Sequence, residues 1–184
     1  MTDAQQFEAF MRNYQNMVFS TSMRLLANPA EAEDIAQEVF LKAYERFGEL
    51  RDSPTVGGWL KTVATNMSLN YLSRYRSRWN FFSELSSGGD DDEKETEYAA
   101  PGNPGEDAVQ ADRQQLVDQA LQNLPAAQRV PLVLYHLEGL RYEEIAAKLN
   151  VSLGKVKTDI FRGREALRKK LRVQLGQDVE TLQS

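Results

Sequence analysis

Residues 152–172 carry the densest group of side chains that can bind nucleic acid. Eight of them are basic and two are acidic, a net charge of +6 (8 − 2), whereas the whole chain has a net charge of −5. Lysine and arginine neutralise phosphates, and a helix in the major groove presents polar side chains to base edges. In a helical segment, one outer face carries Lys155, Lys157, Thr158, Asp159, Phe161, Arg162 and Arg164.

A helix-turn-helix over residues 142–171 would position that face. Ile145, Leu149, Val151 and Val156 have the spacing of its core, and Asn150 falls in the turn, where a left-handed backbone is needed. Ser152 can cap the second helix. The expected inner stripe is Leu153, Val156, Ile160, Leu167 and Leu171. Because turn, cap and charge agree, the segment favours DNA binding over a merely solvated charged helix.

Residues 59–82 interleave aromatic and basic side chains. Asn66 and Asn70 share one helix face with Ser73. Aromatic rings stack on unpaired bases and arginine binds the backbone, so this stretch can hold a single strand. The alternative is that tyrosines and tryptophan at spacings of four form a core stripe. The interleaved residues are Tyr71, Arg74, Tyr75, Arg76, Arg78, Trp79 and Phe81.

A third feature lies on residues 34–41. Asp34, Gln37, Glu38 and Leu41 recur at helical spacing, roughly opposite a stripe that is expected to be buried. Such a face is usually only solvated, but it can also dock a basic partner helix through charge complementarity.

These features belong to an all-α chain of two small helical domains. In residues 1–82, helices are expected over about 7–26, over 28–47 with Asn28 as cap and Gly48 as terminator, and over 59–78. A loop is expected over 50–58. Residues 113–184 form the second domain, with helices over 113–124, 126–137, 142–149 and 152–171 and a short polar tail from 173.

Residues 83–112 are predicted to be a flexible acidic linker. The segment from 81 to 112 has one basic and ten acidic residues, and serine, glycine and proline are frequent in it. Such a composition buries too little apolar surface to offset the entropy of ordering the chain.

The remaining composition narrows the class of protein. The absence of cysteine excludes disulfides and thiolate metal sites. The N-terminal residues lack the pattern of a secretory signal, and no apolar run is long enough to span a bilayer, so we expect a cytoplasmic protein without membrane insertion. No cofactor is expected.

Taken in order, three stretches resemble the extracytoplasmic-function, two-domain (group 4) sigma factors of bacterial RNA polymerase. EAEDIAQEVFLKAYERF resembles the family's region that binds the polymerase clamp. WLKTVATNMSLNYLSRYRSR resembles its promoter-melting, −10-reading region. LPAAQRVPLVLYHLEGLRYEEIAAKLNVSLGKVKTDIFRGREALRKKL resembles its −35-reading domain. The resemblance covers about residues 7–82 and 113–171.

The resemblance implies a factor that binds the clamp helices and the flap region of core RNA polymerase. It would direct transcription initiation at promoter DNA. Asp34, Gln37, Glu38 and Leu41 would contact the clamp, and the 50–58 loop would trap a flipped −10 base. The melted strand would meet Trp59, Lys61, Asn66, Asn70, Tyr71, Arg74, Arg76 and Arg78. The −35 duplex would meet Tyr142, Glu143, Ser152, Lys155, Lys157, Thr158, Phe161, Arg162 and Arg164. The linker would follow the RNA exit path, and an anti-sigma factor would cover the polymerase-binding faces.

Two residues depart from the family's pattern. Lys157 stands where members often carry arginine, which weakens the expectation of bidentate guanine recognition. Asp159 stands where a basic or neutral residue is common; it can accept from a cytosine amino group or pair with Lys155 or Arg162.

Three other functions compete with this interpretation. A helix-turn-helix regulator that acts without polymerase would usually dimerise, and no dimerisation helix is evident. A sigma-like adaptor without DNA binding is a second possibility. An enzyme would have to use Asp90, Asp91, Asp92 and Glu93 as metal ligands in a segment without a scaffold, or His136, the single histidine, which is more typical of a structural residue.

Overall fold

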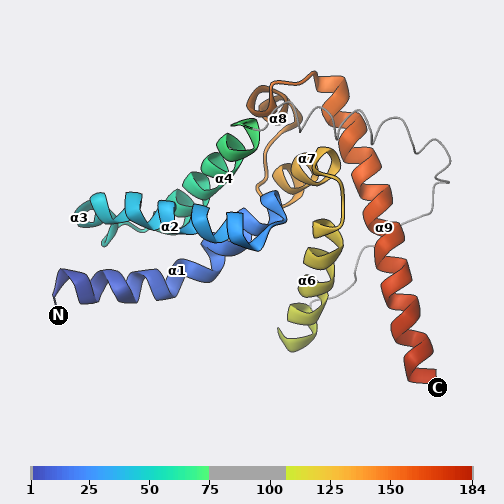
Figure 1. Cartoon of the computed structure of the whole chain (residues 1–184), viewed down its shortest axis with the longest axis horizontal. Coiled ribbons are helices and arrows are strands. Elements are labelled where there is room, and N and C mark those ends of the chain that lie inside the picture. The colour runs from blue at the N-terminus through green and yellow to red at the C-terminus, as the bar shows by residue number, and fades with distance from the viewer. Residues whose placement is uncertain (1, 75–106, 184) are drawn as a thin grey trace. The chain divides into compact units, whose positions relative to one another are not determined.

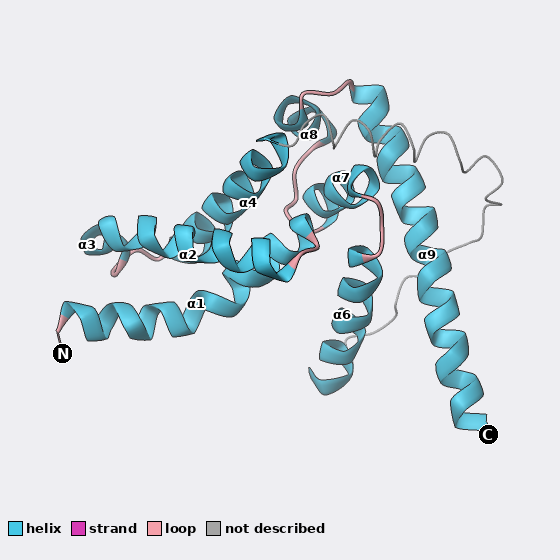
Figure 2. Ribbon diagram, viewed as in Figure 1, coloured by secondary structure: helices cyan, strands magenta, loops and turns pink. Residues whose placement is uncertain are grey.

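The computed structural model describes residues 2–74 and 107–183, and these residues form helices and no strand (Figures 1 and 2). The chain divides into two compact units, Met1–Arg76 and Ser77–Ser184. The all-α expectation is therefore confirmed. The linker expected over 83–112 lies outside the described residues except for its end, because helix α6 begins at Asp107, six residues before the expected start of the second domain.

The first unit is formed by α1 (Asp3–Leu26), α2 (Pro29–Glu45), α3 (Phe47–Leu50) and α4 (Val56–Arg74). Helix α1 packs on both α2 and α4, which also touch each other. The start of α2 confirms the prediction: the Asn28 side chain accepts a hydrogen bond from the Glu31 amide at 3.1 Å, and Pro29 is the first helical residue. The fully buried apolar centre includes Val18, Leu25, Val39, Leu60 and Ala64.

The connection between α2 and α4 differs from the prediction. Gly48 does not terminate a helix; it lies inside α3, because Phe47 packs at 5.1 Å from Phe7 and 5.4 Å from Phe10 and so extends the helical path into the aromatic cluster. Gly57 and Gly58 belong to α4. The expected loop over 50–58 is therefore reduced to residues 51–55.

The second unit contains α6 (Asp107–Gln122), α7 (Ala126–His136), α8 (Tyr142–Leu149) and α9 (Leu153–Gln183). Helix α9 packs against the other three. It continues to Gln183, so the short tail expected from residue 173 is helical. At the crossing of α7 and α9, a side chain on Gly163 would place its Cβ 3.1 Å from the Gln128 carbonyl oxygen, so a small residue is needed there.

The helix-turn-helix matches the sequence closely. Asn150 ends α8 in the left-handed conformation (φ 56°), and the Ser152 hydroxyl accepts a hydrogen bond from the Lys155 amide at 3.1 Å. Ile145, Val156 and Ile160 are buried. Leu153, expected in the inner stripe, is instead 38% exposed, because it stands at the first position of α9, beyond the packed part of the helix.

Candidate functional site

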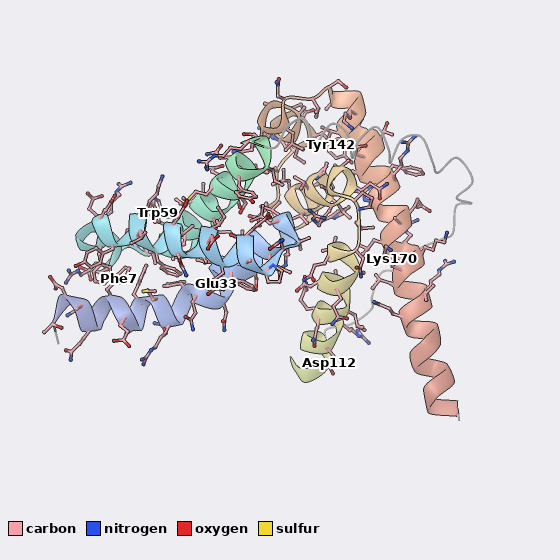
Figure 3. All side chains as sticks on the ribbon, in the orientation of Figure 1. Phe7, Glu33, Trp59, Asp112, Tyr142 and Lys170 are labelled. Carbon is pink, nitrogen blue, oxygen red and sulfur yellow. The ribbon has the colours of Figure 1, made fainter. Side chains whose placement is uncertain are left out.

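The exposed face of α9 near its start, with the beginning of α8, is the candidate recognition surface expected from the sequence. Lys157 and Thr158 are exposed, and Phe161 is 50% exposed although it is a large apolar side chain. Arg162 is half-buried next to them. Tyr142, labelled in Figure 3, begins α8, and Glu143 beside it is exposed. One helix thus presents a cation, a hydroxyl and an aromatic ring together.

Asp159 does not belong to this surface. The residue is only 7% exposed, and the Lys155 Nζ donates to its Oδ2 at 2.8 Å. Burial raises the pKa of Asp159, against the opposing attraction of Lys155 and Arg162. The expectation of an outward-facing Asp159 was wrong, since its carboxylate is turned onto its own helix. Asp159 therefore forms the ion pair with Lys155 that was one of the expected alternatives. The Lys155 ammonium is engaged in this pair.

Arg164 is also turned away from the recognition surface. Its Nε donates to the His136 Nε2 at 2.9 Å, and its guanidinium lies 5.4 Å from the centre of the Tyr135 ring. The Tyr135 ring in turn lies 4.7 Å from that of Tyr142. Arg164 therefore ties α9 to α7 and, through the two tyrosines, to the start of α8.

The contact between Arg164 and His136 predicts a loss of stability in acid. Burial and the Arg164 charge lower the pKa of His136 below its ordinary value of 6.5. The folded state therefore binds fewer protons than the unfolded chain, so this contribution is complete above pH 6.5 and is lost as the pH falls through the folded pKa. Urea unfolding at about pH 7.5 and about pH 5.5 should show the second unit weakened in acid.

His136→Gln is the matched variant, because glutamine can still accept from Arg164 but does not titrate. This variant should lose less stability than the wild type between the two pH values. An equal loss in both proteins would show that another group is responsible, although His136 is the single histidine of the chain.

A groove of about 370 Å³ lies between α6, α7 and α9. Its walls are apolar, with Leu121, Leu132 and Leu167 among them, and Arg164 and Arg168 line it as well. Arg168 is paired with Glu165 at 2.7 Å. Sequence reasoning missed this groove, although the apolar residues of α6 were its signal.

The candidate docking face expected from the sequence is the exposed side of α2. Asp34, Gln37 and Glu38 are exposed, and Leu41 is 66% exposed, so the four predicted residues do lie on one surface. Sequence reasoning missed Tyr44, which extends this face by one turn and is 59% exposed. Its spacing of three from Leu41 was the available signal. The docking face thus combines carboxylates with two exposed apolar side chains.

The α4 surface is smaller than the sequence suggested. Trp59 and Tyr71 pack against the core, and the Tyr71 hydroxyl donates to the Glu31 Oε1 at 2.7 Å. The core-stripe alternative therefore holds for Tyr71, the one ring of the expected stripe that lies among the described residues. Lys61 and Asn66 are half-buried, and Asn70 and Arg74 are exposed. Tyr75, Arg76, Arg78, Trp79 and Phe81 lie outside the described residues.

The loop over residues 51–55 precedes this surface and is anchored at one end. The Arg51 Nη1 donates to Asp3 at 3.3 Å and to Gln6 at 3.0 Å, and its guanidinium lies 4.8 Å from the Phe47 ring centre. The loop is therefore fixed to the start of α1, while Asp52, Pro54 and Thr55 remain exposed.

Within residues 2–74 and 107–183 there is no group of three or more histidine, cysteine or acidic side chains that could hold a metal ion. The acidic residues 90–93 lie outside these ranges. Among the helices of the described part, none has the length and apolar character needed to cross a membrane.

Both units match known families. The family described as "Sigma-70 region 2" matches residues 10–78, and the family described as "Sigma-70, region 4" matches residues 114–167.

Whole-chain relatives carry both parts. The ECF RNA polymerase sigma factor SigW of Bacillus subtilis is 33% identical over 171 residues, which are 92% of this chain and 91% of the relative. The RNA polymerase sigma-H factor of Pseudomonas aeruginosa is 32% identical over 92% of this chain and 88% of its own. The sigma factor RpoE of Bartonella quintana, in a co-crystal structure with the anti-sigma factor NepR, aligns with a TM-score of 0.48 at 23% identity, over 91% of this chain and 97% of that chain.

Proposed function

The chain belongs to the ECF sigma factors, and from this premise we propose that it binds core RNA polymerase and directs it to promoters through separate −10 and −35 contacts. The main support for this proposal is the order of the two matched families: Sigma-70 region 2 is followed by Sigma-70 region 4, and whole-chain relatives align along nearly the whole chain. The sigma factor family is not known for catalysis, so we assign binding roles to its surfaces.

The recognition surface would read the −35 duplex. A helix-turn-helix places the start of its second helix in the major groove, where side chains reach base edges. Lys157, Thr158 and Arg162 offer donors, and Phe161 offers an apolar ring. The start of α8, at Tyr142 and Glu143, would direct free backbone amides at a phosphate. Lys155, Asp159 and Arg164 would support this surface by holding α9 in place, since their side chains are engaged within the unit.

Arg162→Ala tests the base contact. We expect the affinity for the −35 element to fall by about 1–3 kcal/mol, the usual value of one good bidentate contact. Lys169→Ala is the matched control, because it removes an exposed positive charge two turns further along α9. Competition binding with −35 sequence variants should show altered discrimination for Arg162→Ala only. An unchanged sequence profile would remove Arg162 from the recognition surface.

The first unit would bind polymerase and the melted −10 strand. We assign this role to residues 1–82. The residues from 83 to the start of α6 would connect the two parts, and the residues from α6 onward would bind the −35 element. Asn66, Asn70 and Arg74, together with the loop over residues 51–55, would line the path of the strand. Trp59, Lys61 and Tyr71 would support that path, and Arg76 and Arg78, which lie outside the described residues, stay predicted contacts of the strand.

Two surfaces would meet the polymerase. The docking face on α2 has the carboxylates and apolar side chains that suit a basic clamp helix. The apolar groove between α6, α7 and α9 would take the flap region. An anti-sigma factor would act by covering the same surfaces, and the chain would work in the cytoplasm, where polymerase is.

Run-off transcription from a genomic promoter library tests this function. Core polymerase alone should give no promoter-specific product, and addition of the full chain should give discrete products that share −10 and −35 sequences. If no template yields a product that depends on the chain, the proposed function is wrong.

A further inference from the structure

Leu153 is an apolar side chain that the fold leaves at the leading end of the recognition helix. It is the first residue of α9 and is 38% exposed. Five large apolar side chains are exposed among the residues that the structure describes, and two of them, Leu153 and Phe161, lie on this helix near its start. The inner side of the helix is completed by Val156 and Ile160, so the core does not need Leu153.

The position of Leu153 relative to the predicted DNA contacts is regular. Leu153 and Lys157 are four residues apart, and so are Lys157 and Phe161, so each pair is adjacent on the surface of α9 and the three residues form an oblique strip. At a rise of about 1.5 Å per residue, the strip from 153 to 161 extends about 12 Å, which corresponds to three or four base pairs. A duplex that lies against Lys157 must therefore also approach Leu153.

Gly154 adds an independent observation. Glycine destabilises a helix relative to alanine, yet Gly154 has an ordinary φ and a Cβ built on it would meet nothing within 4 Å. The fold therefore gives no reason for a glycine here. Its effect is to leave open space beside Leu153 in the first turn of α9.

The chemistry of the major groove decides what Leu153 can contact. Base edges there present nitrogen and oxygen donors and acceptors, and the one apolar group among them is the C5-methyl of thymine. Leucine cannot hydrogen-bond, so contact with any other edge would desolvate a polar group without replacing its hydrogen bonds. We propose that Leu153 is a specificity residue that reads the methyl group of one thymine in the −35 element. This inference rests on the proposed function.

The test removes the methyl group alone. The reconstituted holoenzyme is titrated on its strongest run-off promoter and on versions in which each −35 thymine, on either strand, is replaced by deoxyuracil. At one position we expect the wild-type affinity to fall about fourfold, the value of one buried methyl group. Leu153→Ala should bind the parent promoter about as weakly and lose its sensitivity at that position. Leu153→Met, which keeps apolar bulk, should retain it.

Val173→Ala is the matched control, because it shortens another exposed apolar side chain of α9 and should keep the wild-type deoxyuracil profile. A flat profile for the wild type, or the same profile in wild type and Leu153→Ala, overturns the role of Leu153 while the proposed function stands. If the chain adds no promoter affinity to core polymerase, the proposed function fails and this inference fails with it.

Discussion

Replacement of Asp34 and Glu38 together by lysine is expected to abolish binding to core polymerase. The two carboxylates lie on the exposed side of α2, and the change turns a local charge of −2 into +2 on the docking face. Like charges that meet across an interface cost several kcal/mol, so a loss of at least a hundredfold in affinity is expected. The fold should persist, because exposed substitutions usually change the free energy of unfolding by less than about 0.5 kcal/mol. Fluorescence titration against core enzyme measures the effect, with circular dichroism as the check on folding.

The matched control reverses two exposed carboxylates elsewhere. Glu8→Lys combined with Asp112→Lys changes the net charge equally but on α1 and α6. It should bind core polymerase like the wild type. Wild-type affinity of the Asp34 and Glu38 variant at normal helicity would reject the docking face.

Ile160→Ala is expected to unfold much of the second unit. Ile160 is 1% exposed and packs in the helix-turn-helix core with Val156 and Ile145. Truncation of a buried isoleucine to alanine costs about 2–5 kcal/mol, a large part of the stability of a small domain. Thermal unfolding should show an early transition of this unit, and transcription from −35-dependent promoters should be lost, while binding to core polymerase through α2 remains.

Ile160→Val is the conservative variant of the same buried side chain. It removes one methyl group and should cost about 0.5–1.5 kcal/mol with promoter use intact. Unfolding of Ile160→Ala that coincides with the wild type would contradict the buried position of this side chain.

Features set by neighbouring residues were predictable from the sequence. Asn28 with Pro29, Asn150 in its turn and Ser152 as a cap all act through contacts within a few residues, and each occurs as expected. The shared exposure of Asp34 and Leu41 was also predictable, because helical periodicity alone places them on one side of α2.

Features set by distant packing were not predictable. Gly48 was expected to end a helix, but the ring of Phe47 packs against those of Phe7 and Phe10 in the core. Arg164 was predicted to be a DNA contact, and its hydrogen bond to a histidine 28 residues earlier has no signal in the local sequence. That contact depends on the close crossing of α7 and α9 at Gly163. Asp159 could be placed only once its burial was known.

Promoter recognition by this chain is expected to require that polymerase positions both units. Footprinting of one promoter with the purified chain, with core enzyme, and with both together tests it most directly. We expect protection of the −10 and −35 regions with the two combined and none with the chain alone. Protection of the −35 duplex by the isolated chain, unchanged when core enzyme is added, would contradict it.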